Sequence, residues 1–491
     1  IIAAHTVDEC KHFALSSAAC LTRHLPRRTR TFRYSTFYSV YPVTLIQQLW
    51  EHAYFPFFEG FVKRRKTHNL YRKALKTQWL PRSELERLQL RAVNELLAHA
   101  KAHVPFYKEN ASYPDSVGSL AELNQLPILT KATIRERSER LLAHGRASSA
   151  WWKATGGSTG EPLKFAHDQT SHEWRTAMSL RGYSWAGALP GTRQAYLWGI
   201  PSQPQETSAR LKEKLHQTID RKRFYNCFDF GPTQMRRCYD ELRTWKPDVI
   251  VAYTNAAYEL ARFIEQQELP PLEVDAVICG AEKVHPTQRE KIRQMLASDV
   301  FDTYGSREFM LMAAECNKHE GLHVSMENVI VEVVDDDNQA VGDGETGRIL
   351  VTDLHNYTMP FIRYEVGDLA KVSSRICSCG RQSQLLEEIV GRSLDVIRMP
   401  DGRVIPGELF PHLMKDFPQV QRFRLHQKAD YSLNLLVVTK ESVLDDITEA
   451  SIRDGIVRLA KSDVPVEITV LDELPLTRSG KHRVTISDVP Q

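Results

Sequence analysis

The chain has 491 residues, of which 42% are hydrophobic and 25% are charged. This length predicts about two to four compact units. Lys plus Arg number 64 and Asp plus Glu number 61, so the formal net charge is +3, which argues against a dedicated nucleic-acid-binding protein. The eight cysteines are too few for a disulfide scaffold, so we expect a reducing, cytoplasmic setting. No apolar run reaches the length of about 18 residues that a transmembrane segment needs.

Residues 1–42 are predicted to be an extension of uncertain structure. Its first part is rich in Ser, Thr and Arg, and five arginines lie between residues 23 and 33. An arginine-rich, acid-poor start is typical of a transit peptide. The same composition also fits a segment without fixed structure, which is the interpretation we favour.

Residues 43–110 are predicted to be helical. In Glu84–Val104 the apolar residues recur at the spacing of one helix face, and Pro105 is expected to end that helix. The aromatic run Tyr54–Phe58 is compatible with contact to a membrane surface. Packing in a core or against a neighbouring helix is the interpretation we favour.

From residue 150 to about 370, short apolar runs alternate with helical stretches, which predicts an α/β domain. The expected helices include Ala256–Gln267 and Pro286–Leu296. Several of the expected strands are almost continuous in Val, Ile and Leu, as in sheets that are covered on both faces. These strands are Asp248–Tyr253, Ala276–Cys279, Asp299–Thr303, Val329–Val334 and Arg348–Thr352.

A smaller unit is expected to begin at residue 391. It is predicted to be a compact α+β module of about 100 residues. Its expected elements, in order, are a strand Asp395–Met399, a helix Glu408–Phe417, strands Val420–His426 and Leu433–Thr439, a helix Asp445–Lys461 and a strand Val466–Leu471. The predicted organisation is therefore a large unit over residues 43–390 and a small one over residues 391–491.

The strongest local signal is the loop from Thr155 to Pro162, whose sequence is Thr-Gly-Gly-Ser-Thr-Gly-Glu-Pro. Its glycines and hydroxyls make a segment whose amides can surround a polyphosphate. It is not a Walker A loop, because the Gly-x-x-x-x-Gly-Lys order is missing. Taken alone, it could equally be a Gly/Ser linker.

Four further segments carry polar residues that suit a nucleotide. Tyr304–Glu308 follows an expected strand, at the edge where open α/β sheets bind ligands. Its ring can stack on adenine, its hydroxyl can bond phosphate and its carboxylate can hold Mg²⁺. Met359–Asp368 ends in an acid suited to ribose hydroxyls. Gly391-Arg392 opens the small unit, and Leu474–Lys481 places a lysine on a loop near the end of the sequence.

In this order and spacing, the five segments resemble the adenylate-forming superfamily of acyl-CoA synthetases, adenylation domains and luciferases. The resemblance covers about residues 60–491. Val104–Tyr107 and Leu126–Lys131 make the chain most similar to the phenylacetate-CoA ligase-like branch, which includes CapK-like proteins of capsule clusters. This implies an α/β fold class, with a large adenylate-forming domain of mixed sheets and helices and a small, mobile α+β C-terminal domain.

The resemblance also implies roles for individual residues. Glu308 would hold Mg²⁺, and Arg392 would contact ribose or phosphate. Lys481 would bridge the substrate carboxylate and the α-phosphate, where a cation offsets the negative charge that gathers during attack. The nucleotide would be bound by Ser158, Thr159 and Gly160 at the β- and γ-phosphates, by Gly280, Ala281, Glu282 and Tyr304 around the adenine, by Ser306 at the α-phosphate and by Asp368 at the ribose. Thr155, Gly157 and Gly305 are further expected nucleotide-binding residues.

Two residues depart from the family pattern. Glu161 stands where the loop often has Lys, so a phosphate contact is lost or passes to Lys153 or Lys164. Leu394 stands where the hinge usually has a charged residue, so either Asp395 serves or the movement of the small domain is altered. Both departures concern the second half-reaction more than the first.

Cys316, His323, Cys377 and Cys379 are the ligand set of a closed tetrahedral structural zinc site. His319 is a competing ligand, and three buried free cysteines are the alternative. We favour zinc. Four protein ligands leave no open position, so the metal would stabilise the wall of the site and do no chemistry.

We therefore expect an enzyme, an ATP- and Mg²⁺-dependent ligase. It would convert a carboxylic acid to an acyl-adenylate, release pyrophosphate and pass the acyl group to coenzyme A. An amine acceptor is the alternative, and a non-catalytic nucleotide-binding protein is a third hypothesis. The oligomeric state is left open. An aromatic or cyclic acid is favoured by Tyr183, Trp185, Trp198, Phe228, Phe230 and Tyr253.

Overall fold

The computed structural model describes most of the sequence from residue 45 onward. Contacts between residues divide the chain into two units, Ile1–Pro42 and Val43–Gln491, and all described residues lie in the second. The described residues are 45–154, 163–199, 217–227, 230–392, 396–400, 404–406, 409–414, 416–417, 419–439, 443–460, 462, 464–474 and 484–489.

Helices fill the first part of the described chain, as predicted. The longest, α3 (Arg82–His103), corresponds to the predicted helix and buries its apolar face. Pro105 follows its end and begins the short α4 (Pro105–Lys108). None of the helices in the described ranges is long and apolar enough to cross a membrane. The preceding helices are α1 (Leu45–Leu49), η1 (Trp50–Tyr54), η2 (Phe57–Val62) and α2 (Thr67–Thr77).

An eleven-stranded mixed sheet forms the centre of residues 45–392, here called the large unit, with the order β10-β11-β12-β13-β9-β8-β7-β6-β5-β3-β4. Its parallel part contains β3 (Gln194–Trp198), β4 (Lys222–Asn226), β5 (Val249–Tyr253), β6 (Val274–Gly280) and β7 (Ala297–Ser306). Its antiparallel part contains β8 (Met310–Glu315), β9 (Leu322–Val324), β10 (Val329–Val334), β11 (Thr346–Asp353), β12 (Tyr364–Ser373) and β13 (Leu385–Arg392).

Strand β7 joins the two parts because its two halves pair differently. Residues from Ala297 to Asp302 pair in parallel with β6. From Thr303 to Ser306 the same strand pairs antiparallel with β8, and the register shifts between Tyr304 and Gly305. The residues that the sequence assigns to the nucleotide therefore begin where β7 changes its partner.

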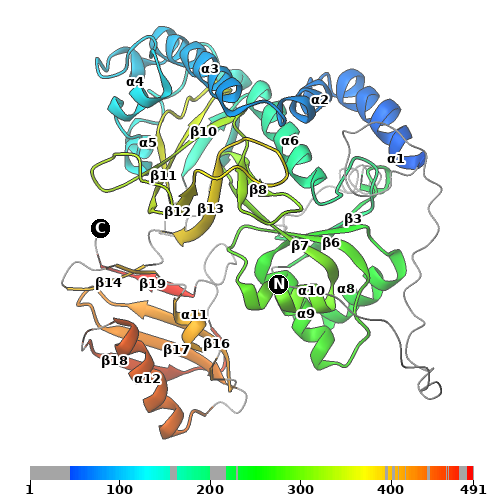
Figure 1. The fold of residues 1–491 in the computed structure, drawn as a ribbon, viewed down its shortest axis with the longest axis vertical. Coiled ribbons are helices and arrows are strands. Elements are labelled where there is room, and N and C mark those ends of the chain that lie inside the picture. Colours follow the sequence, from blue (N-terminus) through cyan, green and yellow to red (C-terminus); the bar gives the residue numbers. More distant parts are fainter. Residues whose placement is uncertain are drawn as a thin grey trace, which may run out of the picture. The chain divides into compact units, whose positions relative to one another are not determined.

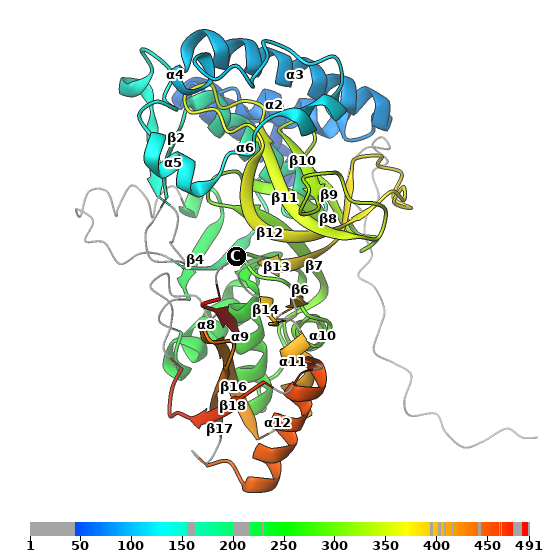
Figure 2. The ribbon, with the colours of Figure 1, turned by 90° about the vertical axis from the view of Figure 1, so that its left-hand side faces the viewer.

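Each part of the sheet has its own apolar core. On the parallel part, α8 (Pro232–Trp245), α9 (Thr254–Gln266) and α10 (Pro286–Met295) pack against one face, and residues around Ala186 pack against the other. The confirmed strands β5 and β6 are accordingly almost continuous in buried residues. On the antiparallel part, α3 and residues 104–143 share a core with the strands (Figure 1, Figure 2).

Shorter elements connect these layers. The hairpin of β1 (Trp151–Ala154) and β2 (Lys164–His167) precedes α6 (Gln169–Ser184), which begins at the capping residue Asp168. The remaining short helices of the large unit are η3 (Leu120–Gln125), α5 (Lys131–Arg137) and η4 (Ala147–Ser149).

A separate apolar core lies within residues 397–464. The predicted strands appear as β14 (Val396–Arg398), β16 (Val420–Gln427), β17 (Leu433–Thr439) and β18 (Val466–Val470), and the helices as α11 (Leu409–Met414) and α12 (Asp446–Ala460). Two three-residue strands were not predicted, β15 (Val404–Pro406) and β19 (Thr485–Ser487). β19 pairs in parallel with β16 and completes a four-stranded sheet, which no apolar pattern in three residues could have indicated.

Two buried ion pairs tie α6 to the antiparallel strands. Arg175 Nη2 lies 2.6 Å from Asp353 Oδ2, and both side chains are almost completely buried. Six residues further along α6, Arg181 Nη1 donates to both carboxylate oxygens of Glu327 at 2.9 Å. Removing one partner of such a pair leaves the other charge buried and uncompensated.

Asp353→Ala should therefore destabilise the large unit by about 3–5 kcal/mol. The urea midpoint, followed by tryptophan fluorescence, measures this loss of stability. All eight tryptophans precede residue 246, so the fluorescence reports on the large unit and not on the C-terminal module. Glu95→Ala is the matched control, since its pair with Arg91 is exposed and worth only about 0–1 kcal/mol. Equal shifts in the two variants would contradict a special role for the buried pair.

Candidate active site

The predicted nucleotide residues gather at the carboxyl ends of β6 and β7. Gly280 is the last residue of β6, and Tyr304, Gly305 and Ser306 are the last residues of β7. Glu308 follows two residues later and is buried. This edge is where ligands bind in open α/β sheets.

Two of the predicted glycines have a local structural reason. A Cβ on Gly305 would lie 2.2 Å from the backbone oxygen of Met310, so only glycine fits where β7 and β8 come close at their register shift. A Cβ on Gly280 would lie 2.9 Å from Thr303 Oγ1. Both glycines therefore permit close strand packing directly beneath the predicted site.

Ala281 and Glu282 form a tight turn after β6. Ala281 has a φ of +67°, which is uncommon for a residue with a side chain. The Glu282 carboxylate accepts a hydrogen bond from the backbone N–H of Asn255 at 3.0 Å, and its backbone oxygen accepts one from Thr254 Oγ1 at 2.9 Å. Glu282 thus holds this turn against the start of α9.

Tyr304 and Asp368 come together across the sheet. The phenol hydroxyl of Tyr304 donates to Asp368 Oδ2 at 2.8 Å, although 64 positions separate the two residues. Asp368 lies on β12, in register with Arg392 of β13. The predicted adenine and ribose residues are therefore adjacent, with the backbone of Arg392 beside them.

Ser306 and Glu308 have few protein partners. Ser306 Oγ is buried and makes no hydrogen bond to the described protein, so it can bond an oxygen of a bound ligand. Glu308 Oε1 accepts a hydrogen bond from the Tyr364 hydroxyl at 2.9 Å. Burial, and then the neighbouring Glu308 carboxylate, raise the pKa of Tyr364 well above its usual value, so it remains a donor.

Several predicted residues lie outside the described part of the chain. They are the loop residues Thr155, Gly157, Ser158, Thr159 and Gly160, and Lys481 near the end of the sequence. The backbone of Arg392 is described, but its side chain is not. The strands that flank the loop do pair, with Ala154 opposite Lys164 in the β1–β2 hairpin.

Lys153 lies on β1 directly before this loop. Burial lowers the pKa of Lys153, and the charges of Arg175 and Arg307 lower it further. A polyanion bound nearby would raise the pKa of Lys153 again, because its negative charge favours the protonated amine. Lys164, the other cation considered as a substitute at the Glu161 position, is exposed. Arg175 and Arg307 were not identified from the sequence, because nothing in their spacing relates them to the loop.

The four predicted metal ligands converge at one point. The Sγ atoms of Cys316 and Cys377 lie 3.6 Å apart, and Cys379 Sγ lies 3.5 Å from His323 Nε2. All four ligand atoms lie within 4.8 Å of one another. A zinc ion with bonds of about 2.3 Å to sulfur would separate two thiolates by about 3.8 Å, so the donor set fits. The sulfur separation is too long for a disulfide.

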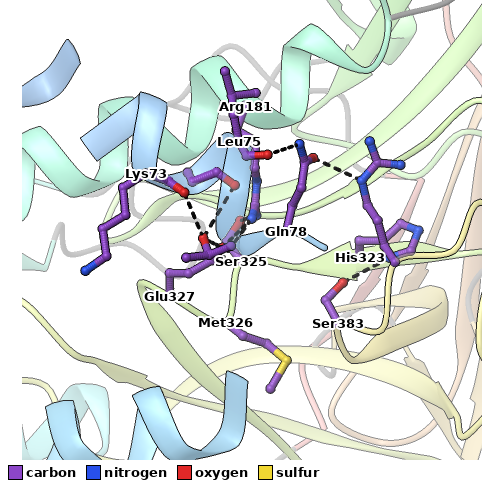
Figure 3. Close-up of polar contacts among 12 residues, drawn as sticks. Lys73, Leu75, Gln78, Arg181, His323, Ser325, Met326, Glu327 and Ser383 are labelled. Atoms are coloured by element: carbon purple, nitrogen blue, oxygen red, sulfur yellow. Dashed lines mark hydrogen bonds and ion pairs between the residues drawn. The ribbon is translucent and has the colours of Figure 1, made fainter. Parts of the chain in front are cut away.

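Other contacts hold these ligands in place. His323 Nδ1 pairs with Ser383 Oγ at 2.9 Å (Figure 3). The hydrogen bond from Cys316, followed by that from His323, lowers the pKa of Cys379. Next to Cys379, Arg381 Nε donates to Gln78 Oε1 at 3.0 Å, which connects the metal loop to the end of α2.

His319 is not part of this cluster, so the competing ligand is excluded by geometry. Its Nε2 lies 3.1 Å from Asp299 and its Nδ1 lies 3.2 Å from Glu315. Hydrogen bonds to these carboxylates raise the pKa of His319 to about 9.

No protein-family model matches the chain. It is 24% identical over 448 residues to a phenylacetate-coenzyme A ligase of Thermus thermophilus, covering 84% of this chain and 98% of the relative. It is 20% identical over 448 residues to protein CapK of Staphylococcus aureus, covering 87% and 94%. A crystal structure of 2-hydroxyisobutyryl-CoA ligase in the postadenylation state matches with a TM-score of 0.68 at 20% identity, covering 84% of this chain and 92% of that one.

The chain has the adenylate-forming fold. The resemblance to phenylacetate-CoA ligase-like and CapK-like proteins that the motifs indicated is thus confirmed, and so is the predicted fold class.

In this adenylate-forming fold, an aromatic cavity of about 170 Å³ lies between α6 and the parallel strands. It is lined by Tyr183, Tyr196, Trp198, Phe224 and Val251. A Cβ on Gly280 would lie 3.8 Å from the Trp198 ring, so one wall of the cavity lies beside a residue of the predicted nucleotide site.

The six aromatics proposed from the sequence have different outcomes. Tyr183 and Trp198 line the cavity, and Tyr253 packs against Trp198 with ring centroids 4.3 Å apart. The assignment of Trp185 to the acid pocket is wrong, because its ring lies against His323 of the metal cluster. Phe230 packs on the opposite face of the sheet, while Phe228 is outside the described residues. Tyr196 and Phe224 were missed, although Tyr196 shares a strand face with Trp198 two residues later.

Proposed function

We propose that the chain activates a carboxylic acid with ATP and then transfers the acyl group to coenzyme A. The observation that carries this proposal is the pairing of Tyr304 with Asp368 at the end of β7, where Ser306 offers a hydroxyl that no described residue bonds and Glu308 a buried carboxylate. The similarity to phenylacetate-coenzyme A ligases supports coenzyme A as the acceptor.

In the first step, the substrate carboxylate attacks the α-phosphorus of ATP and pyrophosphate leaves. Asp368 would bond the ribose hydroxyls, and Ser306 would donate to the α-phosphate. Glu308 would hold Mg²⁺, which neutralises phosphate charge. Lys481 would place a cation between the two reacting anions. The Tyr364 hydroxyl would keep the Glu308 carboxylate oriented.

In the second step, the thiol of coenzyme A attacks the acyl carbon and AMP leaves. We propose that residues 43–390 form the large domain, and that residues 391–491 form a small domain that rotates about Gly391–Asp395 between the steps. This rotation would remove Lys481 from the reacting centre, so the lysine serves the first step alone.

Lys481→Ala should lower the carboxylate-dependent exchange of labelled pyrophosphate into ATP by about 100-fold or more, because a charge that stabilises the transition state is lost. The same variant should still form the thioester when it receives a synthetic acyl-adenylate and coenzyme A.

Lys428→Ala is the matched control, since this surface lysine of the same unit pairs with Glu467 at 3.1 Å. Exchange that is unchanged in Lys481→Ala would refute the proposed role. Transfer from the adenylate to an amine, with none to coenzyme A, would show that the acceptor is an amine and would leave the proposed first step unchanged.

The cavity supports an acid that carries a single ring. Its volume of about 170 Å³ is close to that of an engineered apolar cavity of about 150 Å³ that binds benzene. Aromatic walls favour a planar ring by offset stacking or edge contacts. We therefore propose that the acyl group is a one-ring aromatic or cyclic acid, which a pyrophosphate-release screen over a panel of acids can identify.

Val251→Leu should raise the KM for such an acid about tenfold or more, because one added methylene occupies space that the ring needs. Ile250→Leu is the control, since this neighbour on the same strand points to the opposite face and keeps its volume. KM measurements on both variants decide the point. Equal KM values for Val251→Leu and the unmodified enzyme would exclude this cavity as the acyl site.

We also propose that Cys316, His323, Cys377 and Cys379 bind a structural zinc ion. The support is the convergence of four suitable ligand atoms and the hydrogen bond between His323 Nδ1 and Ser383 Oγ, in which a zinc-bound His323 would donate and which orients its ring. A reducing, cytoplasmic setting would keep these thiols available. The metal would hold the segment after β8 to the loop before β13.

Freshly purified protein should keep about one equivalent of zinc after dialysis, and Cys379→Ser should lose most of it. Elemental analysis measures both. Cys238→Ser is the control, because this buried cysteine on α8 lies in another core. An absence of zinc in the unmodified protein would contradict the proposal.

A further inference from the structure

The first helical segment exposes a row of large apolar side chains. α1, η1 and η2 follow one another without a break from Leu45 to Val62. Leu49, Ala53, Phe57 and Phe61 recur every four residues and are all exposed, so they share the outer face of this largely π-helical segment. Leu49 and Phe57 are each 56% exposed and Phe61 is 75% exposed. The Phe57 and Phe61 rings stack on each other, with centroids 5.4 Å apart.

The other face fastens this segment to the large unit. A Cβ on Gly191 would lie 2.6 Å from the Trp50 side chain, which shows how closely Trp50 packs there. The Phe55 ring meets His68 edge to face at 5.7 Å. The predicted packing of the aromatic run thus holds for Phe55, whereas Phe57 points outward. The apolar row is therefore a fixed feature of the surface.

The exposed charged side chains of this segment are all cationic. Its two acids, Glu51 and Glu59, are both buried. Four consecutive cations, Lys63 to Lys66, follow directly after the row. Lys63 pairs with Glu59 at 3.5 Å, while Arg64 and Lys66 are exposed. The described surface of residues 47–66 thus combines apolar rings and cations without an exposed acid.

We propose that this apolar row and the adjoining cations dock on an anionic lipid surface. Phe and Leu on one face, next to Lys and Arg, are the pattern of helices that lie in a membrane interface. Charge decides among the possible occupants. A second copy that docked by the same patch would bring two runs of four cations together, and residues 1–42 carry five further arginines between 23 and 33. Anionic headgroups are complementary to the cations.

Co-sedimentation of the full-length protein with vesicles tests the proposal. Binding is expected to an equimolar mixture of phosphatidylcholine and phosphatidylserine, and much less to phosphatidylcholine alone. Phe57→Ser with Phe61→Ser should weaken the partition coefficient about tenfold or more, because two exposed rings no longer enter the interface. Arg64→Gln with Lys66→Gln should weaken it about tenfold through lost attraction to the headgroups.

Ile447→Ser is the control, since Ile447 is an apolar side chain with 81% exposure on α12, outside the apolar row, and its loss should not change binding. Thermal unfolding of each variant checks that the fold is intact, and sedimentation velocity reports the oligomeric state. Binding that persists in the double phenylalanine variant, or no binding of the unmodified protein to the mixed vesicles, overturns the proposal. A dimer that the same variant dissociates, without vesicle binding, assigns the patch to a second copy instead.

Discussion

The change of partner within β7 is the constraint on which the rest of the large unit depends. A strand offers one hydrogen-bonding edge to each neighbour, and β7 gives its first half to the parallel β6 and its second half to the antiparallel β8. These two neighbours lie on opposite edges of β7, and the parallel ladder ends at Asp302, one residue before the antiparallel ladder begins at Thr303. The backbone after Gly280 leaves the sheet. Tyr304 and Ser306 stand at this junction because the strand continues past the end of its parallel neighbour.

The same junction explains why residues distant in sequence meet. The antiparallel strands fold back beside β7, and this brings β12 with Asp368 within hydrogen-bond distance of Tyr304. Buried pairs such as Arg175 with Asp353 also hold α6 against these antiparallel strands. The sheet thus sets where the backbone of each site residue lies, and hydrogen bonds such as that from Tyr364 to Glu308 orient the side chains.

Sequence patterns predicted the elements that repeat strongly and missed those that do not. The helix α3 and the strands β5, β6 and β10 follow from regular apolar spacing. The three-residue strands β15 and β19 have no such spacing, and they form because neighbouring strands offer open edges. In the site, local motifs indicated Tyr304, Ser306, Glu308 and Asp368. Tyr364, Tyr196 and Phe224 could not be found in this way, since their role arises only when the sheet brings separate segments together.

The cysteine cluster has a consequence for the chain's conformational freedom. Cys316 and Cys377 are 61 positions apart, and Asp368 lies within the loop that they enclose. Joining the ends of such a loop removes entropy from the unfolded chain. A zinc ion bound by the cluster, as proposed, would therefore favour the ordered β10–β12 segment even without a nucleotide, and its loss would loosen the Tyr304–Asp368 contact from a distance.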